Sequence, residues 1–202
     1  MRSKIYKVKK LICLTLICLT FLSCKKDDDN TTNPTAPGSI GDTYQGGVIF
    51  YLDSNGGGLI AAPTDQSTSS VNWGCTGTTI SGADGTAIGT GAQNTIDIEL
   101  ECTTPGTAAD ICANLTLGGY SDWFLPSKDE LNLMWTNLAD SDGDGQNTGP
   151  SDPNNLGGFA GRTYWSSSEY DYLYAWKQNF GYGDQNVLNR DDYAYVRSVR
   201  AF

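Results

Sequence analysis

The clearest helix start in the chain lies in the sequence Asp122-Trp123-Phe124-Leu125-Pro126-Ser127-Lys128-Asp129-Glu130-Leu131. Ser127 can cap the helix, and Glu130, three residues later, can complete a capping box. An apolar stripe at helical spacing follows, formed by Leu131, Met134, Trp135 and Leu138. We therefore predict a helix that begins after Ser127, ends near Asp140 and buries this stripe.

The sequence before this helix predicts a hairpin and two further helices. Residues 46–53 are rich in strand-forming side chains, residues 54–58 are typical of a turn, and residues 59–62 resume the apolar run. Residues 92–117 carry helical patterns that Pro105-Gly106 interrupts, which predicts two short helices.

The sequence after the helix predicts antiparallel strands. Alternating patterns occupy residues 163–168, 175–180 and 193–199, with a turn at residues 181–183. Arg197 and Arg200 fall on opposite faces of the last of these strands, and we expect one of them to pair with an internal carboxylate. The whole pattern predicts an α+β fold with antiparallel strands and two to three helices.

The first 23 residues have the pattern of a secretion signal. Five basic residues and no acid lie in residues 1–10, and an apolar run follows in residues 11–22. A helix of that length rises only about 18 Å, whereas a membrane-spanning helix needs roughly 20 residues. The sequence Phe21-Leu22-Ser23-Cys24 resembles a lipobox. We predict a lipoprotein signal peptide over residues 1–23 and a lipid on Cys24; the alternative is that Cys24 is one more thiol of the apolar segment.

Residues 24–40 have the composition of a flexible tether, because they are too polar to bury themselves. The run Lys25-Lys26-Asp27-Asp28-Asp29 resembles the export signal that sends lipoproteins of the Bacteroidetes to the cell exterior; a solvated spacer is the alternative. We expect an outer membrane lipoprotein that is held to the membrane by the lipid on Cys24 and exposed at the cell surface.

Charge and histidine content exclude several functions. The chain has 13 basic and 23 acidic residues, and five of the basic ones lie in the signal, so residues 24–202 carry a formal charge of −15. Nucleic acid is therefore excluded as a partner, since its binding needs basic patches. The chain has no histidine, which removes the histidine-based triads and His-bound zinc. We expect one domain over residues 41–202, with no catalytic residue and no required cofactor; a glycan hydrolase that uses two carboxylates is the alternative.

Three cysteines remain beyond the signal and Cys24. Cys112 falls on the apolar face of a predicted helix, which favours a buried thiol. We therefore predict a disulfide between Cys75 and Cys102.

An acidic loop follows the central helix. Asp140, Asp142 and Asp144 occupy the first, third and fifth positions of a calcium-loop pattern, with glycine at the sixth. The twelfth position is Ser151 where an EF-hand has glutamate, and Asp152 is the nearest substitute. The loop is either a calcium site or a solvated acidic connection.

The second half of the chain is rich in aromatic residues. Those inside predicted strands are assigned to core packing: Trp165, Trp176, Phe180 and Tyr195. Loop aromatics beside hydrogen-bonding groups suit a neutral sugar or a protein epitope. The candidate ligand-binding residues are Tyr170, Tyr172, Tyr174, Tyr182, Asp184 and Asn186, with packing or plain exposure as the alternative.

Three segments together carry a family resemblance: residues 122–131, Tyr164-Trp165-Ser166-Ser167-Ser168 and Tyr195-Val196-Arg197-Ser198-Val199-Arg200. In this order and spacing they resemble the domain at the C-terminus of the Legionella collagen-like adhesin, which is also found in many bacterial surface proteins. The opening hairpin fits as well, so the resemblance spans roughly residues 41–202. It implies a C-type-lectin-like domain that recognises an extracellular glycan or protein.

This chain departs from the adhesin because it is strongly acidic and lacks a collagen-like stalk. The adhesin's sulfated glycosaminoglycan ligands and its trimer are therefore not carried over, and self-association stays open. The segment at residues 125–131 is also similar to formylglycine-generating enzymes. Those enzymes use late cysteines, and no cysteine follows Cys112 here. A structural envelope protein without a small ligand is a further alternative.

Overall fold

The structure is a computed structural model, and it describes residues 38–202. The predicted signal peptide, Cys24 and most of the predicted tether lie outside the described residues, so these interpretations stay predictions. Within the described part of the chain, no helix is long and apolar enough to cross a membrane.

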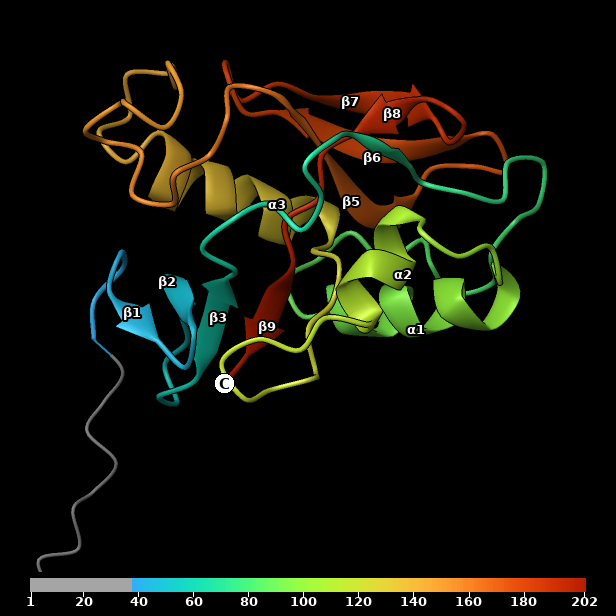
Figure 1. Cartoon of the computed structure of the whole chain (residues 1–202), viewed down its shortest axis with the longest axis horizontal. Coiled ribbons are helices and arrows are strands. Elements are labelled where there is room, and N and C mark those ends of the chain that lie inside the picture. The colour runs from blue at the N-terminus through green and yellow to red at the C-terminus, as the bar shows by residue number, and fades with distance from the viewer. Residues whose placement is uncertain (1–37) are drawn as a thin grey trace, which may run out of the picture. The chain divides into compact units, whose positions relative to one another are not determined.

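The first sheet contains the predicted hairpin. Its four antiparallel strands have the order β1 (Thr43–Tyr44), β2 (Gly47–Leu52), β3 (Gly58–Ala61) and β9 (Val199–Ala201). The hairpin is β2 and β3, and it is confirmed. β9 pairs with β3, with Ala61 opposite Val199 and Leu59 opposite Ala201. The last strand therefore lies beside a hairpin from the beginning of the domain (Figure 1).

The second sheet contains two of the predicted strands and one that we did not predict. Its order is β5 (Thr163–Glu169), β6 (Tyr174–Asn179) and β7 (Gln185–Asn189), all antiparallel. The strands predicted at residues 163–168 and 175–180 are confirmed as β5 and β6. β7 was missed because its sequence, Gln-Asn-Val-Leu-Asn, has only two strand-forming side chains and no alternation.

The single strand predicted at residues 193–199 is wrong. Its first part is β8 (Tyr193–Ala194), which pairs with β4 (Val71–Asn72), and its end belongs to β9. β4 and β8 form a separate two-stranded sheet, and the residues between β8 and β9 pass beside β5 before they reach the first sheet. The Tyr195 carbonyl accepts a hydrogen bond from Trp165 N at 3.0 Å, and the Ser198 carbonyl accepts one from Ala62 N at 2.9 Å. Residues 196–200 are all buried, so the segment runs through the interior although no continuous ladder joins β8 to β9.

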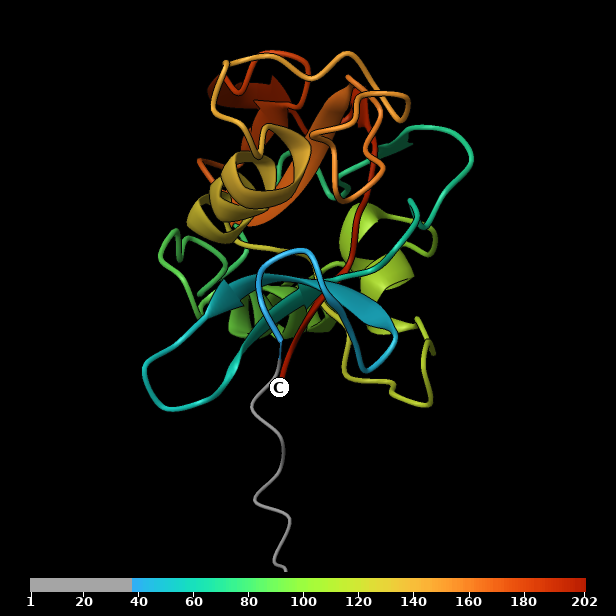
Figure 2. The same cartoon turned by 90° about the vertical axis from the view of Figure 1, so that its left-hand side faces the viewer.

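The helices agree with the sequence pattern. They are α1 (Gly91–Glu101), α2 (Ala108–Ala113) and α3 (Lys128–Met134), and α3 continues through a π-helical turn, η1 (Trp135–Ala139), that ends at Asp140. The capping box of Ser127 and Glu130 is confirmed. Figure 2 shows α3 above the β2–β3 hairpin, and it also contacts β6. The α+β class with antiparallel sheets is thus confirmed.

Glu130 does more than cap its own helix. Its carboxylate is fully buried, and it accepts hydrogen bonds from Ser127 N at 2.8 Å and from Gly89 N at 2.7 Å. Burial raises the pKa of this carboxyl, and the backbone donors oppose that rise. α3 is therefore fastened to the loop that precedes α1.

The core has two large clusters. One surrounds Trp73, Trp165 and Ile98, and the other surrounds Leu131, Phe159 and Phe180. Of the strand aromatics assigned to the core, Trp165 and Phe180 are fully buried, whereas Trp176 and Tyr195 are half-buried. Cys112 is a buried free thiol whose pKa is raised to about 12 by burial.

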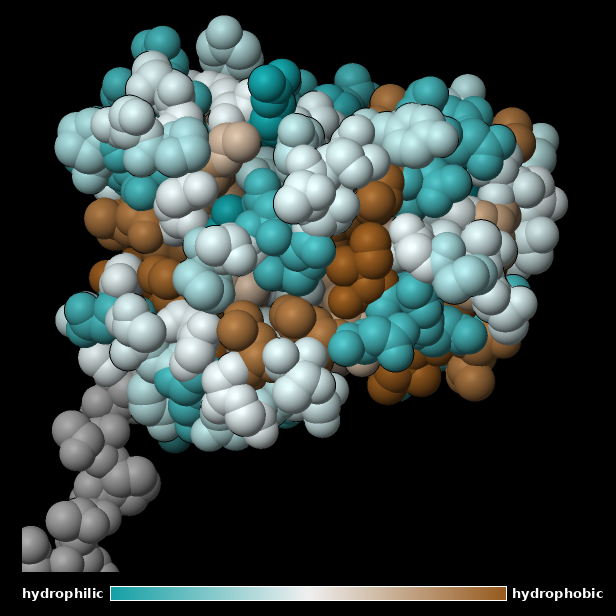
Figure 3. Space-filling view, in the orientation of Figure 1, coloured by the Kyte–Doolittle hydropathy of each residue, from teal (hydrophilic) through white to brown (hydrophobic). Residues whose placement is uncertain are grey.

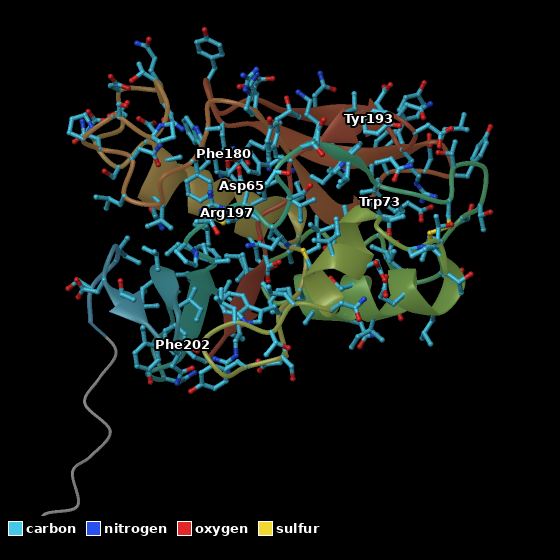
Figure 4. All side chains as sticks on the ribbon, in the orientation of Figure 1. Asp65, Trp73, Phe180, Tyr193, Arg197 and Phe202 are labelled. Atoms are coloured by element: carbon cyan, nitrogen blue, oxygen red, sulfur yellow. A yellow bond between two sulfur atoms is a disulfide. The ribbon has the colours of Figure 1, made fainter. Side chains whose placement is uncertain are left out.

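Buried arginines join distant segments. Arg197 lies beside Asp65, with Nη2 2.7 Å from Oδ1, and both residues are labelled close together in Figure 4. Arg200 pairs with Asp122, so both arginines of the last segment have a carboxylate partner where we expected one. Arg190, which is also buried, pairs with Glu169. Three of the six cations in the described residues therefore link distant segments of the fold.

Candidate functional site

The structure separates the six candidate ligand-binding residues into groups. Tyr170, Tyr172 and Tyr174 lie at the start of β6, and Tyr182 and Asp184 lie in the turn after β6. Asn186 lies between them, opposite Lys177 in the pairing of β6 with β7. A six-residue strand is about 20 Å long, so the structure does not bring these residues together into one site.

The group at the start of β6 forms an exposed aromatic loop. Tyr170 is 58% exposed and Tyr172 is 52% exposed. The Tyr170 ring packs edge-on against Trp176, with centroids 5.6 Å apart. The Asp171 carboxylate accepts hydrogen bonds from the Leu173 and Tyr174 backbones at 2.7 and 2.9 Å. The loop is thus ordered by its own hydrogen bonds.

The group after β6 borders a pocket, which we call the Arg162 pocket. Its volume is about 400 Å³. The loop that follows η1 and the β6–β7 turn provide its lining, which consists of Gln146, Asn147, Thr148, Gly149, Pro150, Ala160, Gly161, Arg162, Gly181 and Tyr182. Tyr182 is 72% exposed, so its ring is available at the edge of this pocket. Of the six candidates, Tyr182 is the one that lines this pocket.

Asn147 gives the Arg162 pocket an unpaired donor. The side chain is 5% exposed, and its Oδ1 accepts hydrogen bonds from Gly149 N at 2.8 Å and from Asn155 Nδ2 at 3.1 Å. These two donors fix which end of the amide is oxygen. The buried Nδ2 atom has no acceptor among residues 38–202. An unmet buried donor costs free energy, so this loop beside the pocket carries a local destabilising contribution.

Arg162 gives the same pocket an unpaired cation. Residues 38–202 contain six lysine and arginine side chains, and five of them lie within 4.0 Å of a carboxylate: Lys128, Lys177, Arg190, Arg197 and Arg200. Arg162 is the one described basic residue without such a partner, and it is exposed. A guanidinium presents a planar set of donors that suits hydroxyl or carboxylate oxygens.

The acidic loop brings three of its four candidate metal ligands together. Asp140, Asp142 and Asp144 each offer an oxygen atom, and these atoms lie within 4.8 Å of one another. Burial raises the pKa of the Asp140 carboxyl, and the neighbouring Asp144 and Asp142 charges raise it further. The calcium site stays a prediction.

Asp152 does not join this cluster, although we predicted it as the fourth ligand. Its carboxylate accepts hydrogen bonds from Thr148 N at 3.1 Å and from Asn154 N at 3.0 Å. These backbone donors hold the pKa of Asp152 below its usual value. Asp152 therefore closes the turn beside the Arg162 pocket.

Cys75 and Cys102 are joined by a disulfide in the structure, with sulfur atoms 2.09 Å apart. The bond links the segment after β4 to the end of α1 and borders the core cluster around Trp73. It lies far along the chain from the residues of the Arg162 pocket and serves the fold.

Sequence reasoning missed Arg162 and Asn147. Arg162 had a usable signal, since a cation is rare in so acidic a chain and this one lies between a glycine and a predicted strand. Asn147 had no such signal, because its unpaired donor results from burial and from hydrogen bonds with Gly149 and Asn155 that form only in the folded loop.

Comparison with known proteins defines the family. No curated protein matches the chain. The family model described as the Lcl C-terminal domain matches residues 64–200. This range contains all three segments on which the resemblance was based, and it begins after the β2–β3 hairpin. Because the match covers more than half of the chain, the protein belongs to the family of the Lcl C-terminal domain.

Proposed function

We propose that this protein is a surface lipoprotein that binds an extracellular glycan in the Arg162 pocket. The observation that carries the proposal is the convergence of an exposed Tyr182 ring, an unpaired cation and the unpaired Asn147 donor on one pocket. Membership of a family of adhesin-like modules supports recognition as the role.

The pocket suits a sugar better than an apolar ligand. Its volume of about 400 Å³ is in the range of small-molecule sites, and its lining is rich in amide, hydroxyl and backbone groups. An aromatic ring beside such donors can cover a sugar face while they bind its hydroxyl groups. The surrounding domain is acidic, so we propose a neutral glycan or one with isolated negative charges.

We also propose that the protein binds its ligand without transforming it. The chain has no histidine, and the carboxylate of Asp152, which neighbours the pocket, is engaged by the Thr148 and Asn154 backbones. A group held ionised in this way is a poor general acid. Hydrolysis of a bound glycan by the purified protein would contradict this part of the proposal.

The glycan proposal predicts a selective loss of binding. The mature chain, purified with Cys24→Ala so that it stays in solution, is tested on a glycan array and its strongest ligand is titrated. Arg162→Ala should weaken affinity at least about tenfold, since a charged hydrogen bond contributes roughly 1.5–3 kcal/mol. Tyr182→Ala should also weaken it, because the ring that covers the sugar face is lost.

Tyr172→Ala is the matched control, because Tyr172 is also an exposed aromatic residue but lies at the other end of β6. It should leave affinity unchanged. A loss confined to Tyr172→Ala would move the site to the aromatic loop, and equal losses in all three variants would contradict the Arg162 pocket as the specific site. Titrations with calcium and with a chelator show whether the cluster of Asp140, Asp142 and Asp144 affects binding.

The lipoprotein proposal predicts that a fatty-acid analogue labels the wild-type protein in cells. Cys24→Ala should abolish both the label and the recovery of the protein with membranes, because Cys24 is the proposed acylation site. Cys112→Ala is the control and should retain both. A label that survives Cys24→Ala would show that the lipid, if present, is attached elsewhere.

A further inference from the structure

A second hollow lies between α1 and the segment that precedes α3, and we call it the Leu100 groove. Its volume is about 490 Å³, and it is lined by Ala92, Thr95, Ile96, Glu99, Leu100, Ala113, Ser121, Asp122, Trp123 and Phe124. It shares no lining residue with the Arg162 pocket. It is therefore a separate surface.

Large apolar side chains of α1 face solvent in this groove. Leu100 is 72% exposed and Ile96, one turn earlier, is 52% exposed. The indole of Trp123 and the ring of Phe124 form a buried floor beside them. Figure 3 shows apolar surface along the lower right-hand edge of the molecule, where Figure 1 places α1. A contiguous apolar hollow with polar surroundings is typical of a protein interaction site, whereas single exposed leucines are not.

The groove also contains a carboxylate without a partner. Glu99 lies between Ile96 and Leu100 on α1, and its buried Oε1 atom accepts no hydrogen bond from residues 38–202. Burial raises the pKa of this carboxyl, and the Asp110 charge raises it further. Arg200 pairs with Asp122 at the rim, and the other described cations except Arg162 pair elsewhere. Among the described residues, no cation therefore compensates the Glu99 carboxylate.

We propose that the Leu100 groove docks a segment of a partner protein in which apolar side chains flank one lysine or arginine. The apolar side chains cover Ile96 and Leu100, and the cation pairs with Glu99. Charge complementarity selects this occupant. A cation beside Glu99 compensates a partly buried carboxylate whose Oε1 atom has no partner among the described residues, whereas a neutral or acidic segment buries the carboxylate further without compensation.

The described part of a second copy of this chain does not fit the groove. The one unpaired cation in the described residues is Arg162, and its aromatic neighbours along the chain, Phe159 and Tyr164, are buried. It cannot present apolar side chains on both sides. An anionic membrane does not fit either, because residues 38–202 contain 20 acidic and six basic side chains.

Three labelled synthetic peptides test the proposal. They share an alternating leucine sequence and differ at the central position, which is lysine, glutamine or glutamate. Fluorescence anisotropy with the mature Cys24→Ala chain should show the lysine peptide binding at least tenfold more tightly than the glutamine peptide, and the glutamate peptide should bind most weakly. Equal affinities for the three peptides would overturn the proposal.

Substitutions inside and outside the Leu100 groove test where the peptides bind. Glu99→Gln should remove the preference for lysine over glutamine, and Leu100→Ser should weaken both peptides. Asp192→Asn and Leu156→Ser are matched controls, since Asp192 and Leu156 are exposed residues outside the groove. If Asp192→Asn reduces the preference for the lysine peptide as much as Glu99→Gln does, the net negative charge of the domain explains the preference, and the groove does not. Arg162→Ala should leave peptide binding intact, which separates this proposal from the glycan site.

Discussion

Arg197→Ala should lower the free energy of unfolding by about 3–5 kcal/mol, because it leaves a carboxylate without its cation inside the domain. The Arg197 side chain is 1% exposed. It donates hydrogen bonds to Asp65 Oδ1, the Ala62 carbonyl and the Gly157 carbonyl, each at 2.9 Å. For a domain of this size the loss corresponds to a fall in Tm of roughly 10 °C, which thermal and urea unfolding can measure.

The position of the guanidinium explains why one side chain has so large an effect. Its carbon lies 4.1 Å from the centre of the Phe159 ring, and the second oxygen of Asp65 accepts a hydrogen bond from the Tyr164 hydroxyl at 3.1 Å. Lysine cannot reach three separate acceptors with a planar group. Arg197→Lys should therefore lose an intermediate amount of stability.

A double-mutant cycle separates the ion pair from the rest. Arg197→Ala/Asp65→Ala should be less destabilised than the sum of the two single variants, since removal of both charges leaves neither uncompensated. Arg162→Ala is the control and should change stability by no more than about 0.5 kcal/mol. Additive losses in the cycle, or a large loss in the control, would contradict the assigned role of the pair.

Removal of the disulfide should cause the second large loss of stability. Cys75→Ser/Cys102→Ser should destabilise the domain by about 3.5 kcal/mol, which is the chain-entropy value for the sequence separation of 27 residues. The bond restricts the unfolded chain, and its loss also removes packing at Cys102, which is 1% exposed. Urea unfolding of the variant measures the change.

Reduction provides the matched control. A reducing agent should lower the stability of the wild type to about that of the double variant and should leave the double variant itself unchanged. After unfolding without reductant, the mature Cys24→Ala chain should show one reactive thiol, from Cys112. Three reactive thiols would show that Cys75 and Cys102 are not bonded.

Local signals predicted the elements of this fold well. The capping box of Ser127 and Glu130 and the β2–β3 hairpin depend on residues that are close in sequence, so their patterns are complete within a short window. The further role of Glu130 depends on Gly89, which lies 41 residues away, and no local pattern contains it. The split of residues 193–199 into β8 and β9 has the same origin, because the segment between them is held by Trp165 and Ala62.

The candidate site shows the same limit. Tyr170 and Tyr182 were grouped because both are loop tyrosines beside polar residues, and the length of β6 then separates them. Arg162 was overlooked because its importance depends on the other five cations, whose carboxylate partners include Asp65 and Asp122 from distant parts of the chain. Arg162 can be recognised as unpaired only when the carboxylate partners of the other five cations are known.

The pairing of β9 with β3 has a consequence for the order of folding. The edge of β3 is completed by residues 199–201, which lie far later in the chain, and Arg197, which pairs with Asp65, lies just before them. Contacts between such distant segments make folding slow. The β2–β3 hairpin can therefore form before the rest of the domain, whereas the complete first sheet requires β9 and the segment that carries Arg197.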